Sequence, residues 1–176
     1  MMQDLAMTIL DIANNSLAVK AQRIEIEIVD SDAKNLISIE IKDNGKGMSD
    51  DQIAQAIDPF YTTRKTRRIG LGIPFFKDLA DLCEGSFSLK SDHGVQIYAS
   101  MRKNHWDRPP MGDLGETIST LIQSDPDVHL ILTITTDAET KKFDTEEIKV
   151  ILEDISIAEP EILFWVKQTV NDLISS

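Results

Sequence analysis

Two neighbouring stretches of this chain alternate isoleucine with polar residues: "RIEIEIVD" at Arg23–Asp30 and "LISIEIKD" at Leu36–Asp43. Successive side chains of a β-strand point to opposite faces, so each stretch predicts a strand with one apolar and one polar face. The intervening "SDAKN" consists mostly of residues that favour turns. Together the three segments predict an antiparallel hairpin that buries one of its faces.

Helical patterns flank this hairpin on both sides. Apolar residues recur at helical spacing within Met2–Ala21. A short helix is expected over Ser49–Ile57, because serine is a favoured N-cap and the two aspartates after it suit the helix dipole. A third helix is expected from Gly70 to about Glu84. The segments "SFSLKS" and "VQIYASM" after it predict a second hairpin.

Two successive prolines interrupt the pattern in "NHWDRPPMGD". They predict a linker at 104–112 between a first unit at 1–103 and a small acidic α/β extension at 113–176. Within this extension we expect a helix at about 113–124, a strand at 127–136, a partner strand near 140–143, and helices that begin near residues 144 and 160.

The composition is that of a folded, acidic protein. Hydrophobic residues make up 41% of the chain. Trp106, Phe164 and Trp165 are expected to be core or packing residues and not a binding platform. The formal net charge is −12, and residues 104–176 hold most of it, with 5 Lys or Arg against 15 Asp or Glu. Such a segment repels nucleic acid, so no nucleic-acid partner is expected. The negative charge of this segment either keeps the protein soluble or forms a docking surface for a basic protein partner.

The sequence predicts neither a membrane protein nor a secreted one. It has no apolar run that approaches the roughly 20 residues of a membrane span. The N-terminal "MMQDLAMTILDIANNS" carries acids in place of the basic region of a signal peptide. Cys83 is the single cysteine and cannot form an internal disulfide. We therefore expect a cytoplasmic location.

Two polar motifs near the first hairpin carry candidate chemistry. Asp11 and Asn15 are four residues apart and share one face of the first helix. Such a pair can hold a hydrated Mg²⁺ and orient a water, or it can be ordinary polar surface. "DNGKGM" (Asp43–Met48) directly follows a strand, where Asp43 can accept a hydrogen bond from an exocyclic amine and glycines permit a ligand to approach the backbone. The alternative is a plain Asp-Asn-Gly turn.

The third motif is "DPFYTTRKTRRIGLGIPF", Asp58–Phe75. Four of the five residues at 64–68 are basic in an otherwise acidic chain, and Gly70 and Gly72 stand at a predicted helix start. The N-terminus of a helix binds anions, and basic side chains add charge-assisted hydrogen bonds to phosphate. The motif predicts a phosphate site, with a basic surface loop as the alternative.

In this order the motifs resemble the Bergerat-fold (GHKL) ATPases, the superfamily of gyrase, Hsp90, histidine kinases and MutL. The resemblance covers roughly residues 2–103 and is greatest to the histidine-kinase and anti-sigma-factor-kinase branch, whose boxes look like "EPFYTTK…GLGL" where this chain has "DPFYTTR" and "RIGLGI". It implies an α+β fold, namely a two-layer α/β sandwich with a mixed, mainly antiparallel sheet. It also implies that the cofactors are ATP and Mg²⁺.

The resemblance further implies a role for each matching residue. Asn15 looks like the Mg²⁺ ligand, and Asp43 like the residue that receives the adenine amino group. The residues implied in shaping the adenine pocket are Gly45, Gly47 and Met48. Those implied near the phosphates are Thr62, Thr63, Arg64 and Arg68 in the lid, then Gly70, Leu71 and Gly72, with Leu71 packed behind the glycine amides. Phe60 is expected to be a packing anchor.

Asp11 stands where the hydrolysing members carry a general-base glutamate, which is one methylene longer. No His-Glu-x-x-x-Pro pattern precedes the first motif, which argues against autophosphorylation of the sensor type. We therefore expect a stand-alone ATP/Mg²⁺-binding module that acts as a cytosolic regulatory switch or as a protein kinase on a separate partner. The alternatives are an anti-sigma-factor-type serine kinase, a simple ATP hydrolase with Asp11 as its base, and a binding module that has lost nucleotide.

Overall fold

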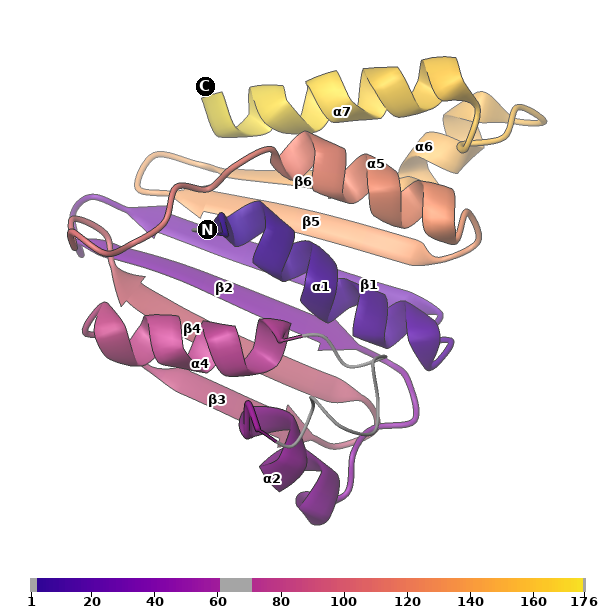
Figure 1. The fold of residues 1–176 in the computed structure, drawn as a ribbon. Helices are drawn as coiled ribbons and strands as arrows, with labels where there is room; N and C mark the ends of the chain where they lie inside the picture. The colour runs from indigo at the N-terminus through magenta and orange to yellow at the C-terminus, as the bar shows by residue number, and fades with distance from the viewer. Residues whose placement is uncertain (1–2, 61–70, 176) are drawn as a thin grey trace.

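The computed structural model describes residues 3–60 and 71–175, in which six strands form one sheet with the order β3-β4-β2-β1-β5-β6 (Figure 1). The strands are β1 (Arg23–Ser31), β2 (Leu36–Asp43), β3 (Phe87–Ser91), β4 (Val95–Arg102), β5 (His129–Thr136) and β6 (Thr140–Asp144). The helices are α1 (Leu5–Ala18), α2 (Asp50–Ile57), α4 (Gly72–Leu82), α5 (Leu114–Ser124), α6 (Thr145–Leu152) and α7 (Pro160–Ser175).

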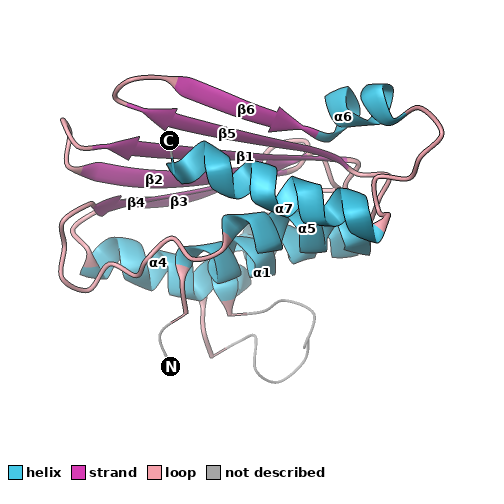
Figure 2. Cartoon of the chain, turned by 90° about the horizontal axis from the view of Figure 1, so that it is seen from above, coloured by secondary structure: helices cyan, strands magenta, loops and turns pink. Residues whose placement is uncertain are grey.

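The sheet and its helices form two layers. Helices α1, α4, α5 and α7 lie on one face of the sheet, and the opposite face is open (Figure 2). The pair β1–β5 is parallel, whereas the other neighbouring strands pair antiparallel. The predicted fold class, a two-layer α+β sandwich with a mainly antiparallel sheet, is therefore confirmed.

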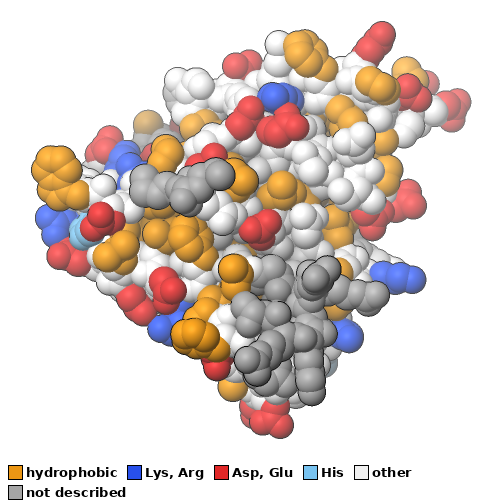
Figure 3. Space-filling view, viewed as in Figure 1, with side chains coloured by type: hydrophobic (Ala, Val, Ile, Leu, Met, Phe, Trp, Pro, Cys, Tyr) orange, Lys and Arg blue, Asp and Glu red, His pale blue; other side chains and the backbone are white. Residues whose placement is uncertain are grey.

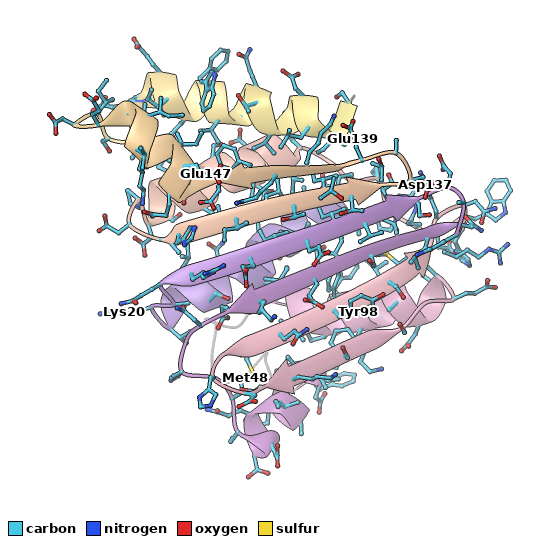
Figure 4. The ribbon with its side chains drawn as sticks, turned by 180° about the vertical axis from the view of Figure 1, so that it is seen from behind. Lys20, Met48, Tyr98, Asp137, Glu139 and Glu147 are labelled. Carbon is cyan, nitrogen blue, oxygen red and sulfur yellow. The ribbon has the colours of Figure 1, made fainter. Side chains whose placement is uncertain are left out.

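The first hairpin forms as its alternation predicts. Ile24 pairs with Asp43 and Ile26 with Ile41, so one face of both strands is apolar. The isoleucines at positions 24, 26, 28, 37, 39 and 41 are all buried under the helices. Burial of each such side chain contributes roughly 1.5–3 kcal/mol relative to exposure. The alternate residues, such as Glu27 and Lys42, form the open face seen from behind in Figure 4.

Helix α1 begins three residues later than its apolar pattern suggests. The side chain of Asp4 accepts a hydrogen bond from the Met7 amide and caps the helix. The amides of Leu5 and Ala6 donate to the carbonyls of Pro110 and Met111. The segment after β4 thus satisfies two amides that a helix N-terminus leaves open, and it ties the two parts of the chain together.

The C-terminal residues complete the same sheet and share its core. All of the elements predicted there form, namely α5, β5, β6, α6 and α7. Ile118 and Leu132 belong to the same buried apolar cluster as Ile24. Helix α7 packs on α5, where Lys167 Nζ lies 2.7 Å from Glu116 Oε2. Acidic side chains are spread over this upper part of the molecule, with few basic ones between them (Figure 3).

The packing predicted for three aromatic residues is wrong. Trp106 is 99% exposed, Phe164 62% and Trp165 45%. Trp106 lies in the turn after β4, and the other two lie on α7, whose buried residues are Val166 and Val170 instead. Across residues 3–60 and 71–175, the structure contains no helix with the length and apolar character of a membrane span.

Candidate nucleotide site

Asp43 ends β2 and is held by three hydrogen bonds. Its Oδ1 accepts from the amides of Gly45 at 2.9 Å and Val95 at 3.2 Å. Its Oδ2 accepts from the hydroxyl of Ser16 at 2.5 Å. The carboxylate is thus fixed between the loop after β2, the start of β4 and helix α1. Fixed hydrogen-bond groups recognise a ligand without first having to be ordered.

The loop after Asp43 follows a path that requires glycine. Gly47 has φ +77°, and a Cβ there would lie 2.7 Å from Ser91 Oγ. The Ser91 hydroxyl accepts from the Met48 amide at 2.7 Å and donates to the Gly94 carbonyl at 2.9 Å. A Cβ on Gly45 would meet Val19 at 3.0 Å. These contacts place the loop against the β3–β4 turn and the end of α1.

Helix α1 contributes two further polar residues beside Ser16. Asp11 Oδ2 accepts a hydrogen bond of 2.8 Å from the side-chain nitrogen Nε2 of Gln3. Asn15 lies one turn later, and its Nδ2 is buried without a hydrogen-bond partner in the part of the chain that the structure describes. A buried unpaired donor costs roughly 1–3 kcal/mol, so this amide is positioned for a group that residues 3–60 and 71–175 do not provide.

The start of α4 lies against the same part of α1. A Cβ on Gly72 would stand 3.0 Å from the Cβ of Asp11 and 3.1 Å from Ile12 Cγ1. The helix N-cap is Leu71, and its side chain makes no capping hydrogen bond. An uncapped helix start attracts anions. The first residue of α4 therefore lies beside Asp11, and Asn15 follows one turn later on α1.

Several predicted site residues lie elsewhere or outside the described part. Thr62, Thr63, Arg64, Arg68 and Gly70 fall within residues 61–70, outside the described residues. Leu71 is 56% exposed, and its packing behind the two glycine amides stays a prediction because Gly70 lies outside the described residues. Phe60 is 84% exposed, so its predicted role as a packing anchor is wrong. Met48 is partly buried against the core.

Three residues in this region were not predicted from the sequence. Ser16 holds Asp43, Gln3 holds Asp11, and Ser91 holds the glycine loop. Serine and glutamine are common on helices and in turns, and their partners lie 8 to 43 residues away in the sequence. A hairpin prediction brings Ser91 near its turn, but no local pattern connects it to Met48.

A polar hollow of about 410 Å³ lies at the same end of the sheet but belongs mainly to the open face. Its lining includes Glu25, Lys42, Gln96 and Lys90, which form one cross-strand row on that face. Asp43 also contributes to it. Asn15 and Ser16 lie on the helical side and do not line this hollow, so the candidate nucleotide site is a different one.

The residues present fit a Mg²⁺–nucleotide ligand. In the described part of the chain, no group of three or more His, Cys, Asp or Glu side chains is arranged to hold a metal ion. Mg²⁺ typically takes only one or two protein oxygens and completes its shell with water and phosphate. The Asn15 amide offers such an oxygen, because a 180° rotation exchanges its nitrogen and oxygen. The absence of a hydrogen-bond partner for this amide nitrogen among the described residues suits that role.

Comparisons with known proteins show the family to which the chain belongs. The sensor histidine kinase YvrG of Bacillus subtilis is 31% identical over 85 residues, which cover 46% of this chain and 15% of that protein. The C4-dicarboxylate transport sensor protein DctB of Pseudomonas aeruginosa is 34% identical over 68 residues, or 38% of this chain and 11% of that protein. The chain thus matches less than a sixth of the length of these curated relatives.

Among solved structures, the Aquifex aeolicus MutL ATPase domain complexed with ADP is similar with a TM-score of 0.50. The likeness covers 87% of this chain and 70% of that one at 14% identity, and so shows the fold alone. The family model described as Histidine kinase-, DNA gyrase B-, and HSP90-like ATPase matches residues 2–105. The predicted resemblance is therefore confirmed, and the chain belongs to the histidine kinase-, DNA gyrase B- and HSP90-like ATPase family.

Proposed function

We propose that this chain binds ATP with Mg²⁺ between α1, the end of β2 and the start of α4. Membership of the ATPase family supports nucleotide binding. The observation that carries the proposal is the buried amide nitrogen of Asn15, which has no partner among the described residues and lies one residue from the serine that holds Asp43. We expect Asp43 to accept a hydrogen bond from the base and the Asn15 amide to meet the metal and phosphate.

Each end of the ligand meets a different kind of group. The Asp43 carboxylate accepts a hydrogen bond from the amino group of the base. The amides of Gly72 and Ile73 at the start of α4 are expected to donate to the phosphates, and the helix dipole favours their negative charge. The Asn15 oxygen takes one position around Mg²⁺, whose charge offsets that of the phosphates when it is bound. We expect the lid residues Arg64 and Arg68 to add positive charge.

The biological output that we propose is a regulatory switch or a protein kinase acting on a separate partner, in the cytoplasm. ATP and ADP differ by one phosphate, and a ligand shifts a conformational equilibrium only through contacts that differ between two states. The acidic surface around α5–α7 is a candidate docking site for a basic partner (Figure 3).

Calorimetry with Mg-ATP, Mg-ADP and metal-free ATP tests the binding proposal. We expect binding of Mg-ATP and at least tenfold weaker binding without the metal, because Asn15 and the phosphates share the ion. Failure of all three ligands to bind would overturn the proposal. If Mg-ATP binds, a second experiment distinguishes the kinase from the switch. Transfer of radiolabelled γ-phosphate to a protein in the native lysate favours the kinase, and labelling of no protein favours the switch.

ATP hydrolysis is a second candidate activity, favoured by the position of Asp11. Its Oδ2 is held by Gln3, and it lies against the first residue of α4, where the phosphates are proposed to bind. A carboxylate at that position can orient a water for attack on the terminal phosphate and accept its proton. Steady-state release of phosphate by the wild-type protein is the test of this activity.

A further inference from the structure

Helix α6 stands apart from the other helices of its half of the chain. It continues from β6 at the edge of the sheet, whereas α1, α4, α5 and α7 form the layer that covers one face (Figure 2). Two of its apolar residues, Ile148 and Leu152, lie one turn apart and pack against the core. Val150 and Ile151 lie between these two positions in the sequence, and their side chains are exposed instead.

Three large apolar side chains are exposed on α6 and in the turn that follows it. Val150 is 79% exposed, Ile151 76% and Ile155 57%. The Ile155 amide donates to the Leu152 carbonyl, so the chain still turns where the helix ends. Single apolar residues on a surface need no explanation, but a group of them marks a contact surface. We call Val150, Ile151 and Ile155 the α6 patch.

Neither packing nor helix propensity explains the two patch residues on the helix itself. Valine and isoleucine branch at Cβ, which restricts their side chains in a helix and lowers their helix propensity. At exposed helix positions, where packing does not decide, unbranched residues such as glutamate and lysine stabilise a helix better. Val150 and Ile151 are therefore poor choices for a free surface, and a contact with another molecule accounts for both.

Acidic side chains accompany the patch. Residues 145–155 contain four acids and one lysine. That lysine, Lys149, already pairs with Glu146 at 3.2 Å. Glu153 and Asp154 are both exposed within the same segment, and neither side chain has a cationic partner among residues 3–60 and 71–175. The surface therefore combines exposed apolar groups with negative charge that the described part of the chain leaves unpaired.

From this combination we infer that α6 binds a basic amphipathic helix of a partner protein. The apolar side chains of that helix lie against the α6 patch, and its lysines or arginines lie against Glu153 and Asp154. Amphipathic helices bind through apolar anchors three or four residues apart, and Ile151 and Ile155 have the same spacing. The inference rests on the docking of a basic partner proposed above, and it adds the surface and the kind of segment that the surface takes.

Charge favours this occupant over two others. A second copy of this chain, whose formal net charge is −12, would bring two acidic surfaces together, and juxtaposed like charges oppose association. An anionic lipid surface attracts basic segments and repels acidic ones. A basic amphipathic helix gains from burial of the apolar patch and also from ion pairs with the unpaired acids.

Fluorescence anisotropy with synthetic peptides tests this inference on the whole chain. The probe is a helical peptide of about 14 leucines and lysines, with the leucines on one face. One comparison peptide has the same composition but spreads the leucines around the helix, and another has glutamate in place of each lysine. We expect the wild type to bind the probe at least about tenfold more tightly than either comparison peptide.

Variants of the protein locate the binding surface. Ile151→Ser should weaken binding of the probe by about tenfold, because it removes an apolar anchor from the patch. Leu82→Ser is the matched control, because Leu82 is also exposed, at 54%, but ends α4. This control should bind the probe as the wild type does. Asp154→Asn should weaken binding by about threefold and reduce its dependence on salt.

Several results would overturn the inference. Equal binding of the probe and either comparison peptide would remove the apolar or the basic part of the recognition. Wild-type affinity of Ile151→Ser for the probe would place any binding of basic segments elsewhere on the acidic surface. A wild-type dimer that Ile151→Ser dissociates, seen by sedimentation, would make a second copy the occupant. Circular dichroism shows whether Ile151→Ser folds, and Val150→Ser replaces it if it does not.

Calorimetry with Mg-ATP on the same samples separates this inference from the proposed nucleotide binding. A wild type that recognises the probe but binds no ATP would overturn the nucleotide site alone. A wild type that binds ATP but does not distinguish the probe from the comparison peptides would overturn the role of the α6 patch alone.

Discussion

Gly72, the first residue of α4, lies in contact with Asp11 of α1: a Cβ on the glycine would stand 3.0 Å from that of the aspartate. This close approach places the uncapped amides of α4 beside the polar face of α1. Gly72→Ala must push the two helices apart by a few tenths of an ångström. We expect a loss of about 1–2 kcal/mol in the free energy of unfolding and weaker binding of Mg-ATP.

Urea unfolding and calorimetry check the effect of this helix contact. Lys77→Ala in the same helix is the control, because its ion pair with Asp81 is on the surface and is worth less than about 1 kcal/mol. A Gly72→Ala protein with wild-type affinity for Mg-ATP would contradict the placement of phosphate at the start of α4.

Asn15→Ala is expected to affect function more than stability. The variant removes a buried amide nitrogen that has no partner in the described residues, so the free energy of unfolding should change by less than about 1 kcal/mol. The Mg²⁺ dependence of ATP binding should disappear, because the proposed metal ligand is gone. Calorimetry with and without Mg²⁺ measures both affinities.

The neighbouring Asn14 supplies the control for this prediction, because it is exposed on the same helix. Asn14→Ala should retain the wild-type dependence on Mg²⁺. A loss of that dependence in both variants, or in neither, would remove Asn15 from the metal site.

Asp11→Asn tests the second candidate activity. If the wild type releases phosphate from ATP, this variant should lose at least about a hundredfold in kcat, because an amide cannot accept the proton from the attacking water. Binding of Mg-ATP should stay within about threefold of the wild type, since the amide keeps the size of the carboxylate. Turnover that survives the substitution excludes Asp11 as the base.

The C-terminal packing should weaken in acid through Asp113. A hydrogen bond from the Glu116 amide lowers the pKa of Asp113 against the opposing effect of burial, with help from Asn171 and Lys167. A carboxyl whose pKa is lower in the folded protein contributes stability above its unfolded pKa of about 3.9 and loses it as pH falls through the folded value. Asp113→Ala should therefore cost about 1 kcal/mol at pH 7, and less below pH ~4.

Urea unfolding at pH 7 and at pH ~3.5 measures this difference. Asp113→Asn is the matched variant, because asparagine caps a helix about as well as aspartate but does not titrate. Its stability relative to Asp113→Ala should not depend on pH. A constant difference between the wild type and Asp113→Ala across this range would show that the charge of Asp113 contributes nothing.

The strands and most helices could be predicted because they depend on short-range patterns. The alternation of isoleucines predicted β1 and β2, and the N-cap residue Ser49 predicted the start of α2. In the structure, the side chains of Ser49 and Gln52 each accept a hydrogen bond from the backbone amide of the other, which is a capping box. The parallel pairing of β1 with β5 joins segments about a hundred residues apart, and no local pattern encodes it. The exposure of apolar side chains could not be predicted from residue type, because Trp106 and Trp165 lie on the surface despite their apolar rings.

In the candidate site, the family motifs led to Asn15 and Asp43 but not to the groups that hold them. The hydrogen bond from Ser16 spans 27 residues of sequence. The exposure of Phe60 could not be read from its motif, because burial depends on which neighbours fold over a side chain. Motifs indicate which residues meet a ligand, whereas the supporting contacts follow from tertiary structure.

Asp43 is proposed to bind the base of a bound nucleotide. The most direct measurement is the affinity of Mg-ATP for the wild type, Asp43→Asn and Asp137→Asn. Asp137 is the matched control, because it also accepts from a buried serine but lies at the opposite end of the sheet. We predict at least about a hundredfold weaker binding for Asp43→Asn and no change for Asp137→Asn. Equal binding of Mg-ATP by all three proteins would contradict the account.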